Sequence, residues 1–186
     1  MTEPIPIAPA APVRVGPPRR PMIAQPEALG TIMPRVLADL ARRMVETMHA
    51  HNGLGLAGPQ VGVGRSIVIV SPDGRPDTEV VMVNPEVLQS QGEQVGEEGC
   101  LSFPGIFVKI RRFERIRVRY QDVTGQGHEI EAEGLLARAI QHECDHLQGR
   151  LLVDRMSAVQ KMAQRRRLRE LKDRHKREAA GAEAVR

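Results

Sequence analysis

The sequence predicts an α+β fold, with mainly antiparallel strands around a central H-E-x-x-H metal-binding helix and a basic helix at the C-terminus. Three observations lead to this class. A segment with helical spacing of apolar residues comes early, several short strand-like segments follow, and the motif helix comes late. The chain has 186 residues, 41% of them hydrophobic, which suffices for one core of ordinary size. Because only 2% of the residues are aromatic, that core must be largely aliphatic.

The chain divides into three expected regions. Residues 1–30 are rich in proline and are expected to form an irregular N-terminal arm. Residues 31–156 are expected to form one compact domain, and residues 157–186 a basic helical tail. Residues 34–51 have amphipathic spacing, which predicts a helix that packs on the core. Strand-like patterns between turn signals cover residues 66–71, 79–83, 106–110, 115–120 and 128–132.

The most informative segment is Q-H-E-C-D-H at residues 141–146, which contains the H-E-x-x-H motif. On a helix, residues i and i+4 lie on the same face, so His142 and His146 can bind one metal ion. Glu143 lies about 100° further round the helix and can reach a water molecule on that ion. The alternative is a pair of surface histidines on an acidic helix.

The surroundings of the motif favour a buried helix that ends near Gly149. Buried histidines and carboxylates are costly unless they bind something, so burial strengthens the metal interpretation. The apolar stripe expected to bury the helix consists of Leu135, Leu136, Ala139, Ile140 and Leu147.

A third protein ligand is needed, and the two cysteines are candidates. Cys144 lies about 200° round the helix from His142, so its sulfur is expected to point away from the ion and pack in the core. Cys100 lies far upstream, in the segment E-E-G-C-L-S between two strand-like regions. A Cys100 thiolate would complete a Cys-His-His site with an open fourth position. The alternative is that Cys100 is a second buried structural cysteine.

A glycine-rich segment, G-L-G-L-A-G-P-Q-V-G, occupies residues 53–62. Glycines let a backbone approach a ligand closely and expose its N–H and C=O groups. A flexible loop is the simplest alternative, and a phosphate-binding loop is disfavoured because its Lys and its Ser or Thr are absent. Gln60 is a neutral amide donor of the kind that can stabilise an oxyanion.

Together, G-L-G-L-A-G-P-Q, E-G-C-L-S and Q-H-E-C-D-H resemble the three signature motifs of the peptide deformylases in order and separation. The resemblance covers residues 34–155 and makes residues 31–156 the catalytic domain. It implies a metal-dependent hydrolase that removes the formyl group from the N-terminal formylmethionine of newly made proteins and releases formate. By this resemblance, Cys100, His142 and His146 would bind the metal, and Glu143 would be the general base and acid. Gln60 and the Leu101 N–H would form an oxyanion hole. The backbone of Gly53, Leu54, Gly55 and Gly99 would pair with the peptide, and Leu135 and Ala139 would line a methionine pocket.

The implied chemistry follows from these residue types. The ion makes a water molecule more acidic, and Glu143 accepts its proton and later protonates the departing amine. The resemblance implies Fe²⁺ as the ion in the cell, with Zn²⁺, Ni²⁺ and Co²⁺ as alternatives that the ligand types do not separate. Many bacterial relatives contact the substrate with a basic residue shortly after the second motif. Here residues 105–108 read Gly-Ile-Phe-Val, so that contact is not carried over.

Positive charge is concentrated in the tail. Residues 157–186 contain ten Lys and Arg and four acidic residues, a net charge of +6. Since the whole chain has 27 basic and 23 acidic residues, residues 1–156 contain 17 basic and 19 acidic residues, a net charge of −2. A solvated helix is one interpretation, and a helix that contacts RNA phosphates is the other. Some bacterial deformylases dock on the ribosome through a C-terminal helix, so the resemblance implies an rRNA contact here.

The expected partners are therefore N-formylmethionyl nascent peptides and the ribosome. No run of about 18 apolar residues occurs, so no membrane partner is expected. The N-terminal segment lacks the apolar centre of a signal peptide and cysteines are few, which predicts a cytoplasmic location. The oligomeric state stays open. Two other interpretations also remain: a different H-E-x-x-H hydrolase that cleaves ordinary peptides, and a ribosome-binding module whose metal site is structural.

Overall fold

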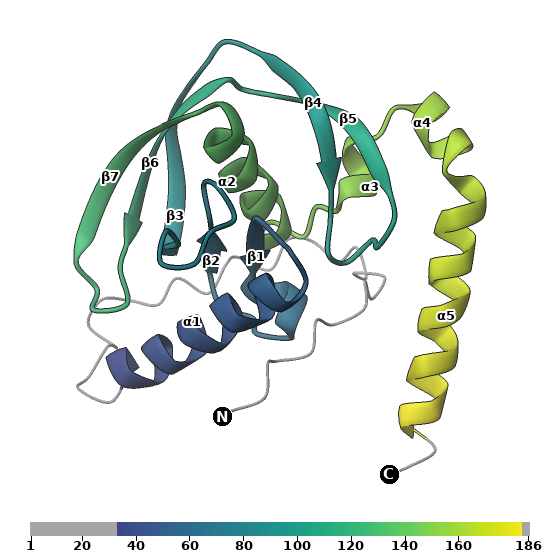
Figure 1. The fold of residues 1–186 in the computed structure, drawn as a ribbon, viewed down its shortest axis with the longest axis horizontal. Coiled ribbons are helices and arrows are strands. Elements are labelled where there is room, and N and C mark those ends of the chain that lie inside the picture. Colours follow the sequence, from purple (N-terminus) through teal and green to yellow (C-terminus); the bar gives the residue numbers. More distant parts are fainter. Residues whose placement is uncertain (1–32, 184–186) are drawn as a thin grey trace.

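A computed structural model describes residues 33–183, so the N-terminal arm expected at residues 1–30 lies outside the described part. The described chain is α+β, as predicted, with antiparallel strands around one central helix (Figure 1). Helix α1 spans Met33–Ala50, in agreement with the helix predicted at residues 34–51. Its buried face presents Leu37, Met44 and Met48 to the core, so Met44 and Met48 serve packing.

Five of the strands form one antiparallel sheet in the order β1-β2-β3-β6-β7. Strand β2 is an unbroken apolar run because both of its faces are covered, and β6 alternates because only one of its faces meets the core. On the outer face of β6, Arg115, Arg117 and Arg119 stand opposite glutamates of β7 in register. The bounds are Gly55–Ala57 for β1, Ile67–Val70 for β2, Val80–Gln91 for β3, Arg115–Gln121 for β6 and Gly127–Glu133 for β7.

The remaining two strands form a separate hairpin that the sequence predicted only in part. Strand β3 continues past residue 83 through an irregular register, and Gly92, with φ of 66°, then turns the chain into β4. Strand β4, Gln94–Gly99, pairs with β5, Phe107–Arg112. The sequence prediction missed β4 because its one apolar residue is Val95, which is exposed, while its buried residue is Glu98.

Helix α2, Gly134–Leu147, contains the motif and lies between the five-stranded sheet and the β4–β5 hairpin (Figure 1). Ile140 and Cys144 are buried in the cluster that joins α2 to the sheet, so Cys144 is the packing residue that was expected. The expectation for Leu135 was wrong in one respect. It was assigned to the stripe that buries the helix, yet 50% of its surface is exposed because it lies at the mouth of a cavity.

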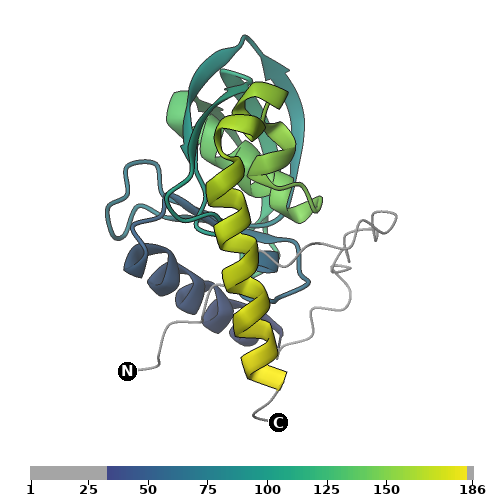
Figure 2. The ribbon, with the colours of Figure 1, turned by 90° about the vertical axis from the view of Figure 1, so that its right-hand side faces the viewer.

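The chain after α2 forms two short helices followed by one long helix. Helices α3, Leu152–Arg155, and α4, Ala158–Ala163, lead into α5, Arg165–Glu183, which runs along one side of the molecule (Figure 2). Leu168 and Leu171 pack against the apolar cluster under the hairpin, and Arg167 donates a hydrogen bond to the Gly105 carbonyl at 2.6 Å. Among residues 33–183, no helix has the length and apolar character needed to cross a membrane.

Candidate active site

Cys100, His142 and His146 converge, although Cys100 is distant from both histidines in the sequence. Cys100 Sγ and His142 Nε2 each lie 3.3 Å from His146 Nε2, and all three ligand atoms lie within 4.8 Å of one another. A tetrahedral ion with Zn–N of about 2.05 Å and Zn–S of about 2.3 Å separates two nitrogens by about 3.3 Å, and nitrogen from sulfur by about 3.6 Å. The donor chemistry of the three groups and the two separations measured from His146 therefore fit one tetrahedral ion.

Glu98 orients His142, and the sequence analysis assigned it no role. Its Oε2 lies 3.0 Å from His142 Nδ1. When Nδ1 carries the ring proton and donates a hydrogen bond to the carboxylate, the lone pair of Nε2 is free to face Cys100 and His146. The only sequence signal is the position of this carboxylate, two residues before Cys100.

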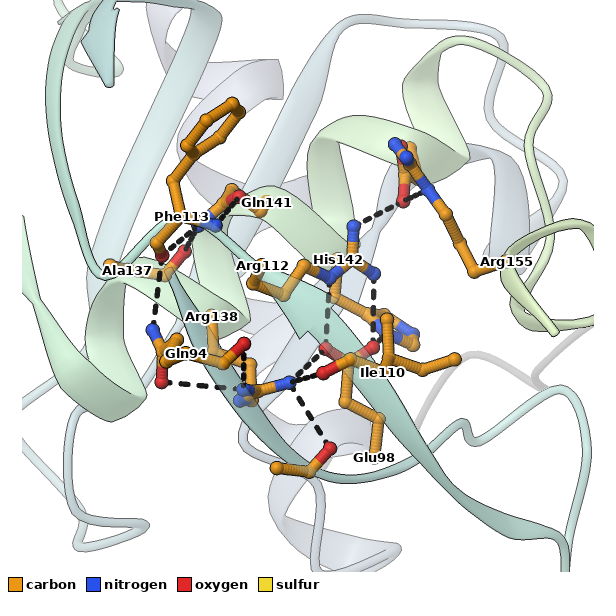
Figure 3. A network of polar contacts seen from close by, with 12 residues as sticks. Gln94, Glu98, Ile110, Arg112, Phe113, Ala137, Arg138, Gln141, His142 and Arg155 are labelled. Carbon is orange, nitrogen blue, oxygen red and sulfur yellow. Dashed lines mark hydrogen bonds and ion pairs between the residues drawn. The ribbon is translucent and has the colours of Figure 1, made fainter. Parts of the chain in front are cut away.

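Two arginines hold the Glu98 carboxylate in its ionised form. Arg112 donates to both oxygens, at 2.8 and 2.9 Å, and Arg138 donates to Oε1 at 2.7 Å (Figure 3). Burial raises the pKa of Glu98, but the hydrogen bonds from Arg112 and His142 outweigh it and bring the pKa to about 2. A buried charge of this kind is tolerated because it is fully paired.

Arg112 extends the network along the motif helix to Asp145. It donates to Asp145 Oδ2 at 2.6 Å, and Arg155 donates to the same oxygen at 2.9 Å. Burial raises the pKa of Asp145, but the two guanidinium groups lower it below its usual value. The second carboxylate of the motif is thus a structural anchor rather than a group that faces the cavity.

The Glu143 side chain is buried beside the ligand cluster. Burial raises its pKa to about 7, while the nearby charge of His142 opposes that rise. Within the described part of the chain, its Oε2 has no hydrogen-bond partner. A buried carboxyl oxygen without a protein partner is unusual, and it leaves Oε2 able to hydrogen-bond to a reactant.

The two histidines differ in protonation because they are close together and buried. Burial, with the neighbouring His142, lowers the pKa of His146 to about 3, so this residue offers a neutral imidazole. Burial also lowers the pKa of His142, but hydrogen bonds to Cys100 and Glu98 outweigh burial and raise it to about 10. Neutral imidazole and thiolate are the forms that bind a metal, so an ion at this position would compete with the second ring proton of His142.

Gln60 lies in the short 3₁₀ helix η2, Gly58–Val61, and its amide orientation is fixed by its neighbours. Its Oε1 accepts a hydrogen bond from the Ala57 N–H at 2.8 Å. Its Nε2 therefore points the other way, 3.2 Å from Ser102 Oγ and 3.8 Å from Cys100 Sγ. The amide presents its donor side to the ligand cluster.

A cavity of about 530 Å³ opens beside these groups. All the site residues expected from the sequence line it, except His146. The lining also includes Phe107, His51 and Arg138, which the sequence analysis did not assign to the site. Phe107, together with Leu54 and Leu135, gives the cavity an exposed apolar rim.

Comparison with known proteins identifies the family. The profile of the polypeptide deformylase family matches residues 18–162. The chain belongs to this family. The peptide deformylase of Thermodesulfovibrio yellowstonii is 48% identical over 127 residues, which cover 67% of this chain and 77% of that protein. The peptide deformylase of Acidobacterium capsulatum is 39% identical over 153 residues, 81% of this chain and 90% of that protein.

A solved structure supports the same family. The crystal structure of a peptide deformylase from Legionella pneumophila is 41% identical, covers 76% of this chain and 84% of its own, and has a TM-score of 0.70. The deformylase family, the α+β class and the hydrolase activity predicted from the sequence are thereby confirmed, and the ligand cluster agrees with a divalent-metal enzyme. The roles of single residues, the identity of the ion and the boundaries of the three regions stay predictions.

Proposed function

We propose that this deformylase binds one divalent metal ion through Cys100, His142 and His146 and removes the formyl group from N-formylmethionyl peptides with Glu143 as proton carrier. The observation that carries the proposal is the meeting of a Cys-His-His ligand set and a buried carboxyl group beside one cavity. When bound, the ion would supply Lewis acidity, which makes a water molecule more acidic and polarises the formyl oxygen.

Glu143 has the properties of a general base that later acts as an acid. A carboxyl group whose pKa is raised to about 7 by burial can accept and release a proton near neutral pH. The unpaired Oε2 would accept the proton of water as the water oxygen attacks the formyl carbon. The same proton would then pass to the departing amine, and formate would leave.

Gln60 and the Leu101 N–H would stabilise the negative charge that develops on the formyl oxygen. The side-chain amide of Gln60 has its Nε2 directed to the ligand cluster, and the hydrogen bond from the Ala57 N–H keeps it there. Leu101 directly follows Cys100, so its backbone N–H comes from the segment that carries the ligand. A fixed donor of this kind needs no reorganisation when charge develops.

The cavity would bind the first residue of the peptide. On α2, Leu135 lies about two helical turns before His142 and Ala139 about one turn before it, and their apolar surfaces would contact a methionine side chain. The Gly53 N–H already donates to the Met48 carbonyl, and the Leu54 carbonyl already accepts from the Ser71 N–H. The pairing proposed for Gly53 to Gly55 and for Gly99 would therefore use their other backbone groups.

We propose Fe²⁺ as the ion in the cell, with Zn²⁺, Ni²⁺ and Co²⁺ able to replace it. A thiolate with two imidazoles suits several of these ions, so availability and activity would decide among them. The ligand set leaves one tetrahedral position for a reactant, which is the arrangement of a catalytic rather than a structural site. This favours the enzyme over a ribosome-binding module with a structural metal.

We propose that α5 contacts ribosomal RNA. Leu168 and Leu171 hold the helix to the domain, while Arg165, Arg169 and Lys172 are exposed and follow one another at helical spacing on another face. Such a stripe can contact successive phosphates. Contact with the ribosome would hold the enzyme where formylated chains emerge in the cytoplasm, the location we propose for it.

The experiment that tests the main proposal is formate release from the peptide formyl-Met-Ala-Ser. Metal-free protein would be prepared without oxygen and loaded with Fe²⁺, Zn²⁺ or Ni²⁺. Fast release that requires the ion is expected, with no cleavage of unformylated peptides under the same conditions. Cleavage of ordinary peptide bonds would instead support a different H-E-x-x-H hydrolase. No release with any ion at full occupancy would refute the proposed activity.

A further inference from the structure

Arg138 joins the motif helix to the hairpin that carries Glu98. It lies four residues before His142 on α2 and is 6% exposed. Its Nη1 donates to Glu98 Oε1 at 2.7 Å and to the Ile110 carbonyl at 3.0 Å (Figure 3). The guanidinium also lies 3.3 Å from the Gly96 carbonyl and 3.3 Å from Gln94 Oε1. One side chain of α2 thus bonds to both strands of the hairpin.

The hairpin is shaped to receive this guanidinium. Gly96 and Ile110 face each other in the β4–β5 register, so the two carbonyls that Arg138 contacts belong to one pair. A Cβ atom on Gly96 would lie 2.9 Å from Arg138 Nη2 and 3.0 Å from its Cζ. Contacts below 3.0 Å require atoms to move, so the missing side chain at Gly96 makes room for the arginine.

The two elements that Arg138 joins are the two that supply the ligands. The hairpin carries Glu98 and leads directly to Cys100, whereas α2 carries His142 and His146. The distance between Cys100 and the histidines therefore depends on how the hairpin lies on the helix. Arg112 ties the hairpin to Asp145, further along α2, so the two arginines fix the hairpin at separate points.

We propose that Arg138 is a positioning residue of the metal centre, which fixes Cys100 and Glu98 relative to His142 and His146. This inference rests on the proposed metal site. A purely structural arginine would contribute to folding stability alone, and its loss would leave the metal affinity of the folded protein unchanged. A positioning residue sets the affinity itself, because a displaced thiolate and a freed Glu98 no longer match the ion.

The first test compares Arg138→Met with the parent. Methionine keeps most of the apolar stem but donates no hydrogen bond, so the hairpin loses the hydrogen bonds from residue 138 and keeps those that join Arg112 to Asp145 and Glu98 to His142. We expect the Zn²⁺ affinity of the metal-free protein, measured by competition with a chelator, to fall about tenfold to a hundredfold. We also expect the thiolate-to-metal absorption band of the Co²⁺ form to weaken. Arg138→Lys keeps the charge without the planar fork and should give an intermediate affinity.

The control is Arg119→Met, which removes an exposed arginine of β6 that pairs with Glu129 and should leave affinity and spectrum unchanged. Gly96→Ala gives an independent test because it displaces the guanidinium without altering it. Gly96→Ala should lower the metal affinity of the parent. In Arg138→Met it should lower the affinity little further, because the guanidinium atoms that the new Cβ would contact are absent. If Arg138→Met fails to fold, Arg138→Lys and Gly96→Ala decide the question.

The outcomes separate this inference from the proposal beneath it. If the parent binds no ion, the proposed metal site is wrong. If the parent binds one ion and the folded Arg138 and Gly96 variants bind it within twofold of the parent, with an unchanged Co²⁺ spectrum, the positioning role is overturned.

Discussion

Gly55 lies so close to Glu143 that a side chain at residue 55 would meet the carboxyl group. A Cβ atom there would stand 2.8 Å from Glu143 Cδ. The glycine of the first sequence motif therefore makes room for the carboxyl group of the third motif, in addition to any contact with a peptide. The two motifs are far apart in sequence and become one structure because β1 packs against α2.

Gly55→Ala should lower turnover by about a hundredfold while the metal content stays unchanged, because Glu143 must move from its position beside the ligand cluster. Formate release and metal analysis of the same preparation would measure both effects. Gly64→Ala is the matched control, since a Cβ there has nothing within 4 Å. Equal turnover in the two variants would show that the position of Glu143 is not critical.

Glu143→Gln should retain the ion and lose at least a hundredfold in turnover, since an amide cannot accept the proton of water. The substitution keeps the size of the side chain, so the cavity and the ligand separations should persist. Single-turnover formate release at full metal occupancy is the decisive measurement. Near-normal activity would exclude Glu143 as the base.

Glu143 should also give the metal-free protein a pH-dependent stability. In the unfolded chain its carboxyl group loses its proton near pH 4.5, whereas burial holds the folded pKa at about 7. The folded state binds the extra proton between these values, so stability falls as the pH rises through this window. As the pH rises from 4 to 8, the free energy of unfolding of Glu143→Gln should increase relative to that of the parent by up to about 3 kcal/mol. Denaturant unfolding at both pH values would measure this gain, and a constant difference would contradict the buried, protonated carboxyl group.

The two cysteines should behave differently. Cys100→Ala should weaken or abolish metal binding, because it removes the thiolate that closes the ligand set. Cys144→Ala should leave metal binding intact, since Cys144 is buried in the apolar cluster and burial raises the pKa of its thiol to about 12. Metal stoichiometry after gel filtration would separate them. Full occupancy in Cys100→Ala would remove this residue from the ligand set.

Replacement of Arg165, Arg169 and Lys172 by Gln should weaken binding to ribosomes and leave formate release from short peptides unchanged. The contacts of Leu168 and Leu171 would remain, so α5 should stay attached to the domain. Three lost phosphate contacts should reduce the slope of log affinity against log salt by about 2. Replacement of the exposed Arg35, Arg65 and Arg115 removes the same charge elsewhere and should have little effect. Equal binding by both triple variants would rule out α5 as the docking surface.

Local geometry allowed much of this protein to be predicted from its sequence. His142 and His146 lie on one helix face because four residues make about one turn, and Cys144 points into the core for the same reason. The apolar run of β2 and the alternation of β6 reflect burial on two faces and on one face, so both strands were recognisable. The resemblance of three short motifs supplied the family, which the comparisons confirm.

Only the tertiary structure revealed how the charged residues are used. Glu98 is 14 residues from Arg112 and 44 residues from His142, and all three are residue types that are commonly found on protein surfaces. A buried carboxylate is stable only when its partners are already in place, so its role follows from the pairing of the hairpin with α2. Strand β4 lacked an apolar signal because the residue that it buries is Glu98. Leu135 was assigned to the buried stripe because the sequence does not reveal the cavity that it lines. The sequence by itself determined how side chains within one helical turn or one strand are placed relative to each other. Only the folded chain decided which distant charged side chains pair, and which metal-site residues those pairs hold in place.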